Sequence, residues 1–436
     1  MNTDTIVHHP MRLLLCMALG TFAVGTEGFM IAPLLPQLAS DLSHSIVAVG
    51  QLITVFTLSY AFSSPILTAL TGGISRRNLL IAAMAGFTMA NVVAACAPNY
   101  WTLMFARVLL ALLAGLYVPN ANALAGAIVP PEHRGRALAI VTGGTSVAVA
   151  LGVPLSALVG HGFGWRVTFA IVGALALLAT VGLAVSLAHD VGADLPVARL
   201  SERLAVLRQK AVLLALLVTL LWAAGAYAVY TYLSVFLAQA VGISGAHVGL
   251  VLFAWGISAA IGVTTGGALT DRLGSKRVII TSLSLLALAF VTMSASAYGL
   301  SPADARVPVL TAIVVWGLAA WSFFPAQQTS LIGLAGVKLA SVVLSLNASF
   351  MFGGFALGAA IGSATVAQGS PEALGFVGAA CIATSLLIVL LTTRARAHHT
   401  LPIMDLIAAH ASPSTPRRQW RWRRAPLARS SRPACR

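Results

Sequence analysis

Apolar runs of about 20 residues recur along nearly the whole of this 436-residue chain. A helix of that length crosses the hydrocarbon core of a bilayer and satisfies its own backbone hydrogen bonds there. Only 8% of the residues are charged, against about 25% in a soluble globular protein. The short alternating segments of a membrane β-barrel are absent from the sequence. The sequence therefore predicts an all-α polytopic membrane protein.

We expect twelve spans in two groups of six. The first six lie near residues 12–33, 47–70, 78–97, 100–121, 138–160 and 165–187, and the second six near 211–239, 246–269, 278–298, 308–331, 341–366 and 373–392. This predicts four parts: an N-terminal six-helix half at 1–187, a cytoplasmic linker at 188–210, a C-terminal six-helix half at 211–393, and a basic cytoplasmic tail at 394–436. We expect the tail to be disordered.

Basic residues are distributed unequally between alternate loops. If the N-terminus is cytoplasmic, the outer loops contain only Arg166 and Arg306, and the other loop Lys and Arg residues fall on the inner side. Lys and Arg accumulate in cytoplasmic loops, so we expect a multi-pass protein of the inner or plasma membrane with both termini in the cytoplasm. These loops and the tail also account for the net charge of +15, which therefore does not indicate nucleic-acid binding.

The second half repeats features of the first. S-R-R-N-L-L at 75–80 matches S-K-R-V-I-I at 275–280, and a stripe of small residues in the fifth span has a counterpart in the eleventh. Such stripes let helix backbones approach closely. We assign to this helix-packing motif Gly144, Gly152, Pro154, Gly160, Gly354, Gly358 and Gly362. Two parallel six-helix repeats predict a binding site at their interface, near the middle of the membrane.

The loop between the eighth and ninth spans, G-G-A-L-T-D-R-L-G-S-K-R at 266–277, resembles the signature loop of the major facilitator superfamily. The match to G-x-L-x-D-R-x-G-x-[RK]-[RK] runs through Gly267, Leu269, Asp271, Arg272, Gly274, Lys276 and Arg277. The resemblance covers roughly residues 11–393 and implies the twelve-helix fold of that superfamily. Asp271 would then latch the inner side by accepting hydrogen bonds from a helix N-terminus or a basic residue. The alternative is a plain positive-inside loop.

The equivalent loop of the first half keeps only the basic pair Arg76 and Arg77. Thr71 stands where the acid is expected, and Ile74 where the second glycine is expected. Any role of that first acid in a latch therefore does not carry over.

Within the superfamily the chain is most similar to the twelve-span drug:proton antiporters, in particular to the sugar and chloramphenicol efflux permeases. The resemblance is carried by T-E-G-F at 26–29, R-V-L at 107–109, P-P-E-H-R-G-R-A at 130–137 and L-G-V-P at 151–154. The antiporter marker of the fifth span is matched in part, because a valine separates its glycine from its proline. The resemblance implies proton-coupled efflux of small amphipathic compounds, such as drugs or sugars, by alternating access.

Two other functions stay open. One is a proton symporter or facilitator that takes up a small polar solute on the same fold. A more remote one is a membrane-embedded sensor or enzyme. The chain has no H-E-x-x-H motif and no Walker loop, and its four cysteines lie far apart. We therefore expect no catalytic residues, no metal and no cofactor, and an ion gradient as the energy source, with sodium as the alternative to protons.

Glu27 and Arg107 are the candidate proton-coupling pair. Glu27 is the only acidic residue that we place inside a span, and a carboxyl at bilayer depth is costly enough to mark a functional site. Glu27 lies nine residues before Pro36 and Arg107 seven after Tyr100, so both lie at a similar depth below the outer surface. We expect Glu27 to carry the proton and Arg107 to tune its proton affinity. The alternatives are a protonated Glu27 that only bonds a neighbouring helix, and an Arg107 that snorkels or clamps two helices.

Polar and aromatic residues in the cavity-lining spans are the candidates for a substrate cavity. Aromatic faces suit flat or cationic compounds, although each such residue alone is more often a packing residue or an interfacial anchor. The candidates are Gln51, Tyr60, Asn120, Asn122, Trp222, Tyr227, Tyr230, Tyr232, Trp316, Trp321, Gln327, Gln328 and Asn347.

The expected partners are a small-molecule substrate, protons and the lipid bilayer, and a monomer suffices for the mechanism. The tail segment R-R-Q-W-R-W-R-R at 417–424 either lies on the anionic inner leaflet or has no role in transport.

Overall fold

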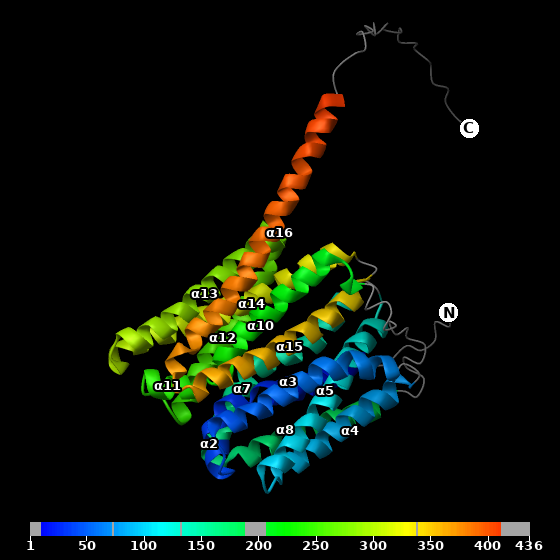
Figure 1. The fold of residues 1–436 in the computed structure, drawn as a ribbon. Helices are drawn as coiled ribbons and strands as arrows, with labels where there is room; N and C mark the ends of the chain where they lie inside the picture. Colours follow the sequence, from blue (N-terminus) through cyan, green and yellow to red (C-terminus); the bar gives the residue numbers. More distant parts are fainter. Residues whose placement is uncertain (1–9, 72–73, 131–132, 188–205, 337–338, 411–436) are drawn as a thin grey trace, which may run out of the picture. The chain divides into compact units, whose positions relative to one another are not determined.

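The structure is a computed structural model that describes residues 10–71, 74–130, 133–187, 206–336 and 339–410. These residues are mostly helical, and none of them lies in a strand (Figure 1). The helices of the first half are α1 (Pro10–Phe29), α2 (Ile31–Asp41), α3 (Ile46–Leu70), α4 (Arg76–Ala95), α5 (Tyr100–Ala127), α6 (Arg134–Val147), α7 (Val153–Phe163) and α8 (Trp165–Ser186). Those of the second half are α10 (Lys210–Thr231), α11 (Leu233–Ala240), α12 (Ala246–Leu273), α13 (Ser275–Gly299), α14 (Pro302–Ala335), α15 (Ala340–Ala367) and α16 (Leu374–His410).

Twelve helices in the described part of the chain are long and apolar enough to cross a membrane. They match the twelve expected spans to within a few residues at most ends, and the prediction of an all-α polytopic protein is confirmed. Met1–Leu390 forms one compact unit, and Leu391–Arg436 forms a second. The expected linker falls largely on residues 188–205, which lie outside the described residues.

The tail differs from its expected description. We expected disorder from residue 394 onward, but α16 continues as a helix to His410. Extending an existing helix avoids the unfavourable nucleation step, and this favours continuation of the twelfth span. The basic, tryptophan-containing segment at 417–424 lies outside the described residues.

The first span is divided by a turn at Met30 between α1 and α2. Proline has no backbone N–H. Pro33 therefore cannot bond the carbonyl of Phe29, and Pro36 cannot bond the carbonyl of Ala32, four residues earlier in each case. The divided span thus has free backbone acceptors inside the bundle, and these must find donors elsewhere.

The fifth span is also irregular. A π-helical turn, η2 (Ala148–Gly152), joins α6 to α7. It ends two residues before Pro154, which lacks the N–H that an α-helix would donate to Ala150. Turns of this kind occur often at functional sites, and η2 packs against α1 and α12.

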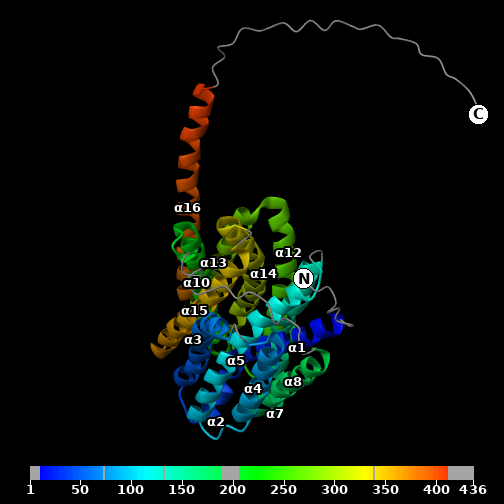
Figure 2. The same ribbon diagram turned by 90° about the vertical axis from the view of Figure 1, so that its right-hand side faces the viewer.

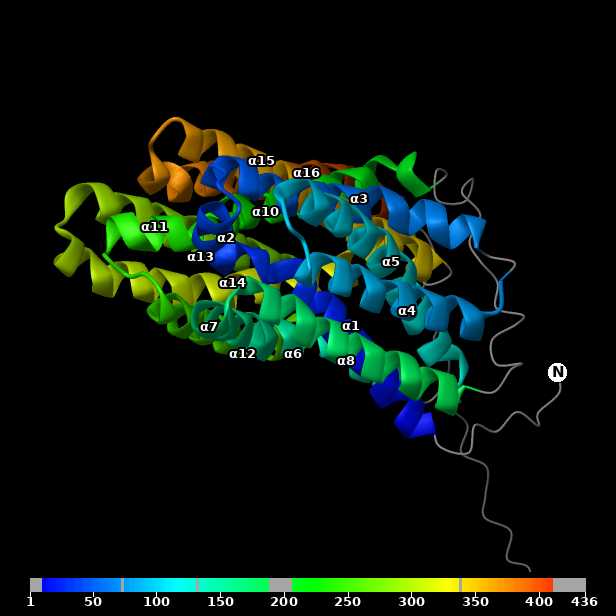
Figure 3. The same ribbon diagram turned by 90° about the horizontal axis from the view of Figure 1, so that it is seen from below.

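The two halves meet along two pairs of helices. α3 packs along α15 on one side, and η2 and α7 pack against α12 on the other (Figures 1 and 3). Within each half, α1 lies against α6 (Figure 3) and α10 against α15 (Figure 2). The repeat seen in the sequence is therefore matched in space, because the first span meets the fifth in one half and the seventh meets the eleventh in the other.

The small residues of the fifth span allow the close approach to the first. A Cβ on Gly144 would collide with the carbonyl of Ala18, and one on Gly152 would collide with the hydroxyl of Thr26. A Cβ on Gly160 would meet the movable end of the Leu34 side chain on α2. Gly144 and Gly152 therefore have the stronger need for glycine, because the first span occupies the space of a side chain.

The glycines of the eleventh span face α10. Gly354, Gly358 and Gly362 approach, in that order, the carbonyl groups of Leu220, Ala224 and Ala228. Each added Cβ would meet backbone rather than the movable end of a side chain.

This close approach predicts the effect of one methyl group. We expect Gly358→Ala to lower the stability of the folded protein by about 1–3 kcal/mol, because α10 must move to admit the methyl. The matched control is Gly353→Ala on the same helix, where an added Cβ meets nothing within 4 Å and helix propensity improves. Apparent melting temperatures in detergent compare the two. Equal values for both variants would contradict the packing role.

Candidate functional site

Glu27 and Arg107 form a buried ion pair. Nη1 of Arg107 lies 2.5 Å from Oε1 of Glu27, and both side chains are 0% exposed. Among the acidic side chains that the structure describes, that of Glu27 is the buried one. The expected pair at one depth is thus in direct contact.

Local structure sets both positions. The side chain of Asn99 accepts a hydrogen bond from the N–H of Thr102 and begins α5. Arg107 follows two turns later on the buried face of that helix. Glu27 lies in the last turn of α1, directly before the turn at Met30. The guanidinium of Arg107, although it belongs to α5, thus lies at the C-terminal end of α1, where the helix dipole favours a cation.

Arg107 also links α1 to α3. Its Nη1 donates to the backbone carbonyl of Glu27 at 3.2 Å, and its Nε donates to the carbonyl of Leu52 at 3.3 Å. The guanidinium carbon lies 4.0 Å from the ring centroid of Phe56. Leu52 and Phe56 carry no charge, and no pattern in the sequence indicates that they lie here. The helix-clamp interpretation of Arg107 therefore describes its contacts as well as the pairing interpretation does.

The pair is incompletely satisfied. Oε2 of Glu27 and Nη2 of Arg107 are buried and have no hydrogen-bond partner among the described residues. Buried polar atoms without partners are rare in folded proteins. One carboxylate oxygen is therefore free to receive a proton, and one guanidinium N–H is free to donate to an incoming group.

The second half bonds the divided span close to Glu27. The hydroxyl of Tyr227 donates to the carbonyl of Gly28 at 3.1 Å, and that of Tyr230 to the carbonyl of Phe29 at 2.9 Å. Ser234 donates to the carbonyl of Ala32 at 3.2 Å. Two of these carbonyls are the ones that Pro33 and Pro36 leave free. The residue next to Glu27 is thus bonded directly to the other half of the protein.

An aromatic cavity lies beside this junction, and its empty space together with the adjoining open solvent is about 310 Å³. It includes five of the expected cavity residues, three on α10 and two on α14. Its lining is Phe29, Trp222, Ala226, Tyr227, Tyr230, Trp255, Trp316, Ala320, Trp321 and Phe355. Phe29, Trp255 and Phe355 were missed, and apart from their aromatic character no local pattern in the sequence distinguishes them from packing residues.

Four other candidates make contacts away from this cavity. Arg76 is buried and bonds the side chain of Asn120 at 2.5 Å. Asn122 accepts a hydrogen bond from Thr142. Asn347 accepts one from Thr219. None of these asparagines lines the cavity.

Gln327 joins the Asn347 group, because its Nε2 donates to Thr219 at 3.1 Å. Gln328 is half-buried on α14 and has no hydrogen bond to a described residue. Tyr232 is buried, and a Cβ on Gly50 would collide with its hydroxyl.

Two candidates lie where the halves meet along α3 and α15. Nε2 of Gln51 donates to the hydroxyl of Ser363 at 3.2 Å. The ring of Tyr60 stacks on that of Phe352, with centroids 3.7 Å apart. Both residues hold the halves together in this structure.

The two signature loops differ in their contacts. Nε of Arg77 donates to the carbonyl of Leu187 at the end of α8. Asp271 is exposed and has no hydrogen bond or ion pair to any described residue. Gly274 has φ +82° and turns the chain from α12 into α13. The other loop residues, Gly267, Arg272, Lys276 and Arg277, are half-buried or exposed.

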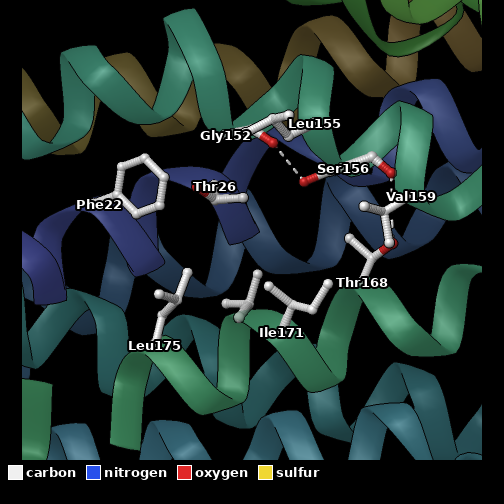
Figure 4. A pocket seen from close by; sticks show the side chains of 10 residues that line it. Phe22, Thr26, Gly152, Leu155, Ser156, Val159, Thr168, Ile171 and Leu175 are labelled. Atoms are coloured by element: carbon white, nitrogen blue, oxygen red, sulfur yellow. Dashed lines mark hydrogen bonds between the residues drawn. The ribbon is translucent and has the colours of Figure 1, made fainter. Parts of the chain in front are cut away.

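A second hollow lies between α1, α7 and α8 (Figure 4). Phe22, Leu155, Ile171 and Leu175 give it an apolar lining. Leu155 and Ile171 are exposed, so this hollow opens on the outside of the helix bundle and not on the space between the two halves. It contains no charged side chain, and among the predicted site residues it includes Gly152. Within the described residues, no cluster of His, Cys, Asp and Glu suited to a metal ion is present.

Comparison with known proteins gives consistent matches. The model of the Major Facilitator Superfamily matches residues 17–242 and 215–425. The uncharacterized MFS-type transporter YbcL of Bacillus subtilis is 33% identical over 375 residues, which cover 86% of this chain and 94% of that protein. A chloramphenicol resistance protein of Streptomyces lividans is 31% identical over 307 residues, covering 69% and 76%. The crystal structure of the nucleoside transporter NupG matches with a TM-score of 0.69 and 14% identity, covering 87% of this chain and 99% of that one.

Proposed function

The chain belongs to the Major Facilitator Superfamily and is a multi-pass membrane transporter rather than an enzyme, and from that premise we propose that it exports small amphipathic compounds in exchange for protons. Glu27 carries the proton, and Arg107 sets its affinity. The observation that carries this proposal is the buried pair with a free carboxylate oxygen, next to the residues that bond the second half.

Coupling follows from charge balance at the pair. With Glu27 ionised, the buried pair is neutral. When Glu27 takes up a proton, Arg107 is left as a buried cation without a counter-charge, which is unfavourable. Substrate binding in the adjacent cavity that favours the ionised pair then expels the proton. After substrate release outside, proton uptake on the outer side would let the substrate-free transporter return to the conformation that is open to the inside. The proton is released there.

The direction of transport is supported by resemblance. The Streptomyces lividans relative is named for chloramphenicol resistance, and export is one way to resist a drug. Proton release on substrate binding separates antiport from the uptake alternatives, because a symporter binds proton and substrate together.

Substrate-induced proton release tests the proposal. Purified protein in weak buffer is titrated with chloramphenicol, an uncharged drug, ethidium, a flat cation, and lactose, a sugar. We expect at least one compound to release protons from the wild type and not from Glu27→Gln. Asp304→Asn is the matched control, since Asp304 is an exposed carboxyl and its variant should behave as the wild type. Equal binding to both proteins without proton release would contradict antiport and favour uptake.

The proposed orientation has its own test. Cys96 is exposed at the end of α4, which we place on the outer side, whereas Cys435 lies in the tail that we place in the cytoplasm. A membrane-impermeant maleimide applied to intact cells should label the wild type and not Cys96→Ser. Cys435→Ser should be labelled as strongly as the wild type. Labelling that survives in Cys96→Ser and disappears in Cys435→Ser would reverse the orientation.

A further inference from the structure

Three tryptophans of the aromatic cavity have unused hydrogen-bond donors. Trp222, Trp255 and Trp316 are 4%, 3% and 1% exposed, and their Nε1–H groups have no partner among the described residues. They come from α10, α12 and α14, and all three line the same cavity. An indole N–H can only donate, and leaving it buried and unpaired is costly. Three residues that line one cavity thus each have a buried donor without an acceptor among the described residues.

We propose that the cavity binds an uncharged, flat aromatic compound that carries hydrogen-bond acceptors, such as ring nitrogen, carbonyl or nitro groups. This assignment names the substrate class and rests on the proposed transport function.

The lining disfavours a charged substrate, because only contact with the aromatic faces could offset the lost hydration of a cation. None of its ten residues is Asp, Glu, Lys, Arg or His. A cation or anion placed there would lose its hydration without meeting an opposite charge. The nearby acid, Glu27, is already paired with Arg107.

The hydrogen-bonding pattern is unfavourable for a sugar. The hydroxyls of Tyr227 and Tyr230 already donate to backbone carbonyls of the first half, so the remaining polar groups are mainly the three indole donors. A sugar brings a hydroxyl donor with almost every acceptor, and those donors would find few acceptors here. A compound with acceptors alone matches the pattern.

The shape of the lining suits a ring system. Tyr227 stacks on Phe355 with centroids 4.0 Å apart, and Trp255 lies 5.5 Å from Trp316. Phe29 contributes an edge from the first half, 5.7 Å from Tyr230. Offset and edge-to-face contacts of this kind extend readily to an inserted aromatic ring.

Two matched tricyclic probes test the assignment by calorimetry at pH 8. Acridine is uncharged at this pH and accepts a hydrogen bond through its ring nitrogen, whereas carbazole has nearly the same frame and donates through its N–H. We expect acridine to bind the wild type roughly tenfold more tightly than carbazole, as one mismatched hydrogen bond predicts. Ethidium and lactose should bind more weakly than acridine.

Tryptophan variants locate the interaction. At least one of Trp222→Phe, Trp255→Phe and Trp316→Phe should weaken acridine binding by roughly three- to tenfold and leave carbazole binding nearly unchanged, because phenylalanine keeps an aromatic face and lacks the N–H. The control is Trp101→Phe, because Trp101 is 72% exposed and lies outside the cavity. A variant that does not fold is replaced by the other two.

Each result decides the proposal. Equal affinity for acridine and carbazole, tighter binding of ethidium or lactose, no detectable binding of acridine, or no effect of any of the three variants would overturn it. Proton release is measured separately. If ethidium or lactose binds better and releases protons, the substrate class is wrong and antiport stands. If acridine binds as expected without proton release, the substrate class stands and antiport fails.

Discussion

Glu27→Gln is expected to abolish substrate accumulation driven by a pH gradient while leaving substrate exchange intact. Glutamine keeps the size and one carbonyl oxygen of the side chain, so it can still accept the hydrogen bond from Arg107. It cannot release a proton. A transporter with glutamine here can still change conformation with substrate bound, and so exchange substrate across the membrane. It cannot use the proton gradient.

Inside-out vesicles measure both activities. Accumulation under an imposed pH gradient should fall to background in Glu27→Gln, and counterflow of labelled substrate should remain measurable with a weaker apparent affinity, because glutamine mimics the protonated side chain. Glu27→Asp keeps the titratable group and should retain partial accumulation. Undiminished accumulation in Glu27→Gln would remove Glu27 from the coupling mechanism, and loss of both activities would indicate a structural role instead.

Arg107→Leu is expected to have the largest effect on stability. It removes the partner of a fully buried carboxyl and the bonds from α5 to the carbonyls of Glu27 and Leu52. Breaking a buried pair on one side costs about 3–5 kcal/mol. We expect a much lower melting temperature in detergent, or loss of the folded protein, and no transport.

A double variant separates the charge from the clamp. Replacing both partners, Glu27→Leu with Arg107→Leu, removes the uncompensated charge, so most of the lost stability should return while proton coupling stays absent. Arg107→Lys keeps the charge with fewer donors and should be intermediate in stability. If the double variant is no more stable than Arg107→Leu, the bonds to α1 and α3 backbone outweigh the ion pair.

The positions of the membrane spans along the sequence could be predicted, because they depend on local properties of the chain. A bilayer requires an apolar run of fixed length, and the twelve spans match the helices for that reason. The free carbonyls of the first span follow from the prolines at 33 and 36, which have no N–H to donate. The glycines of the fifth and eleventh spans likewise indicate close approach without naming the partner helix.

The candidate site could be predicted in part. Matching depths brought Glu27 and Arg107 together as candidates, since both belong to spans that start or end at the same surface. Asn120 and Asn347 were grouped with the cavity as polar residues of cavity-lining spans, and the structure places them in contacts with Arg76 and Thr219. Depth is fixed by position along a span, but the direction of a side chain around its helix depends on the neighbours.

The sequence alone determined the membrane environment, the twelve spans and the candidate pair Glu27 and Arg107, whereas the division of the first span into α1 and α2 came from the structure. Only the tertiary structure decided that Tyr227 and Tyr230 supply donors to the divided span, and that Trp255 and Trp316 share a cavity with Phe29. The reason is physical. Span length and helix breaks follow from the bilayer and from backbone chemistry within a few residues, whereas a cavity is formed by side chains from separate helices, and its members are fixed only when those helices pack.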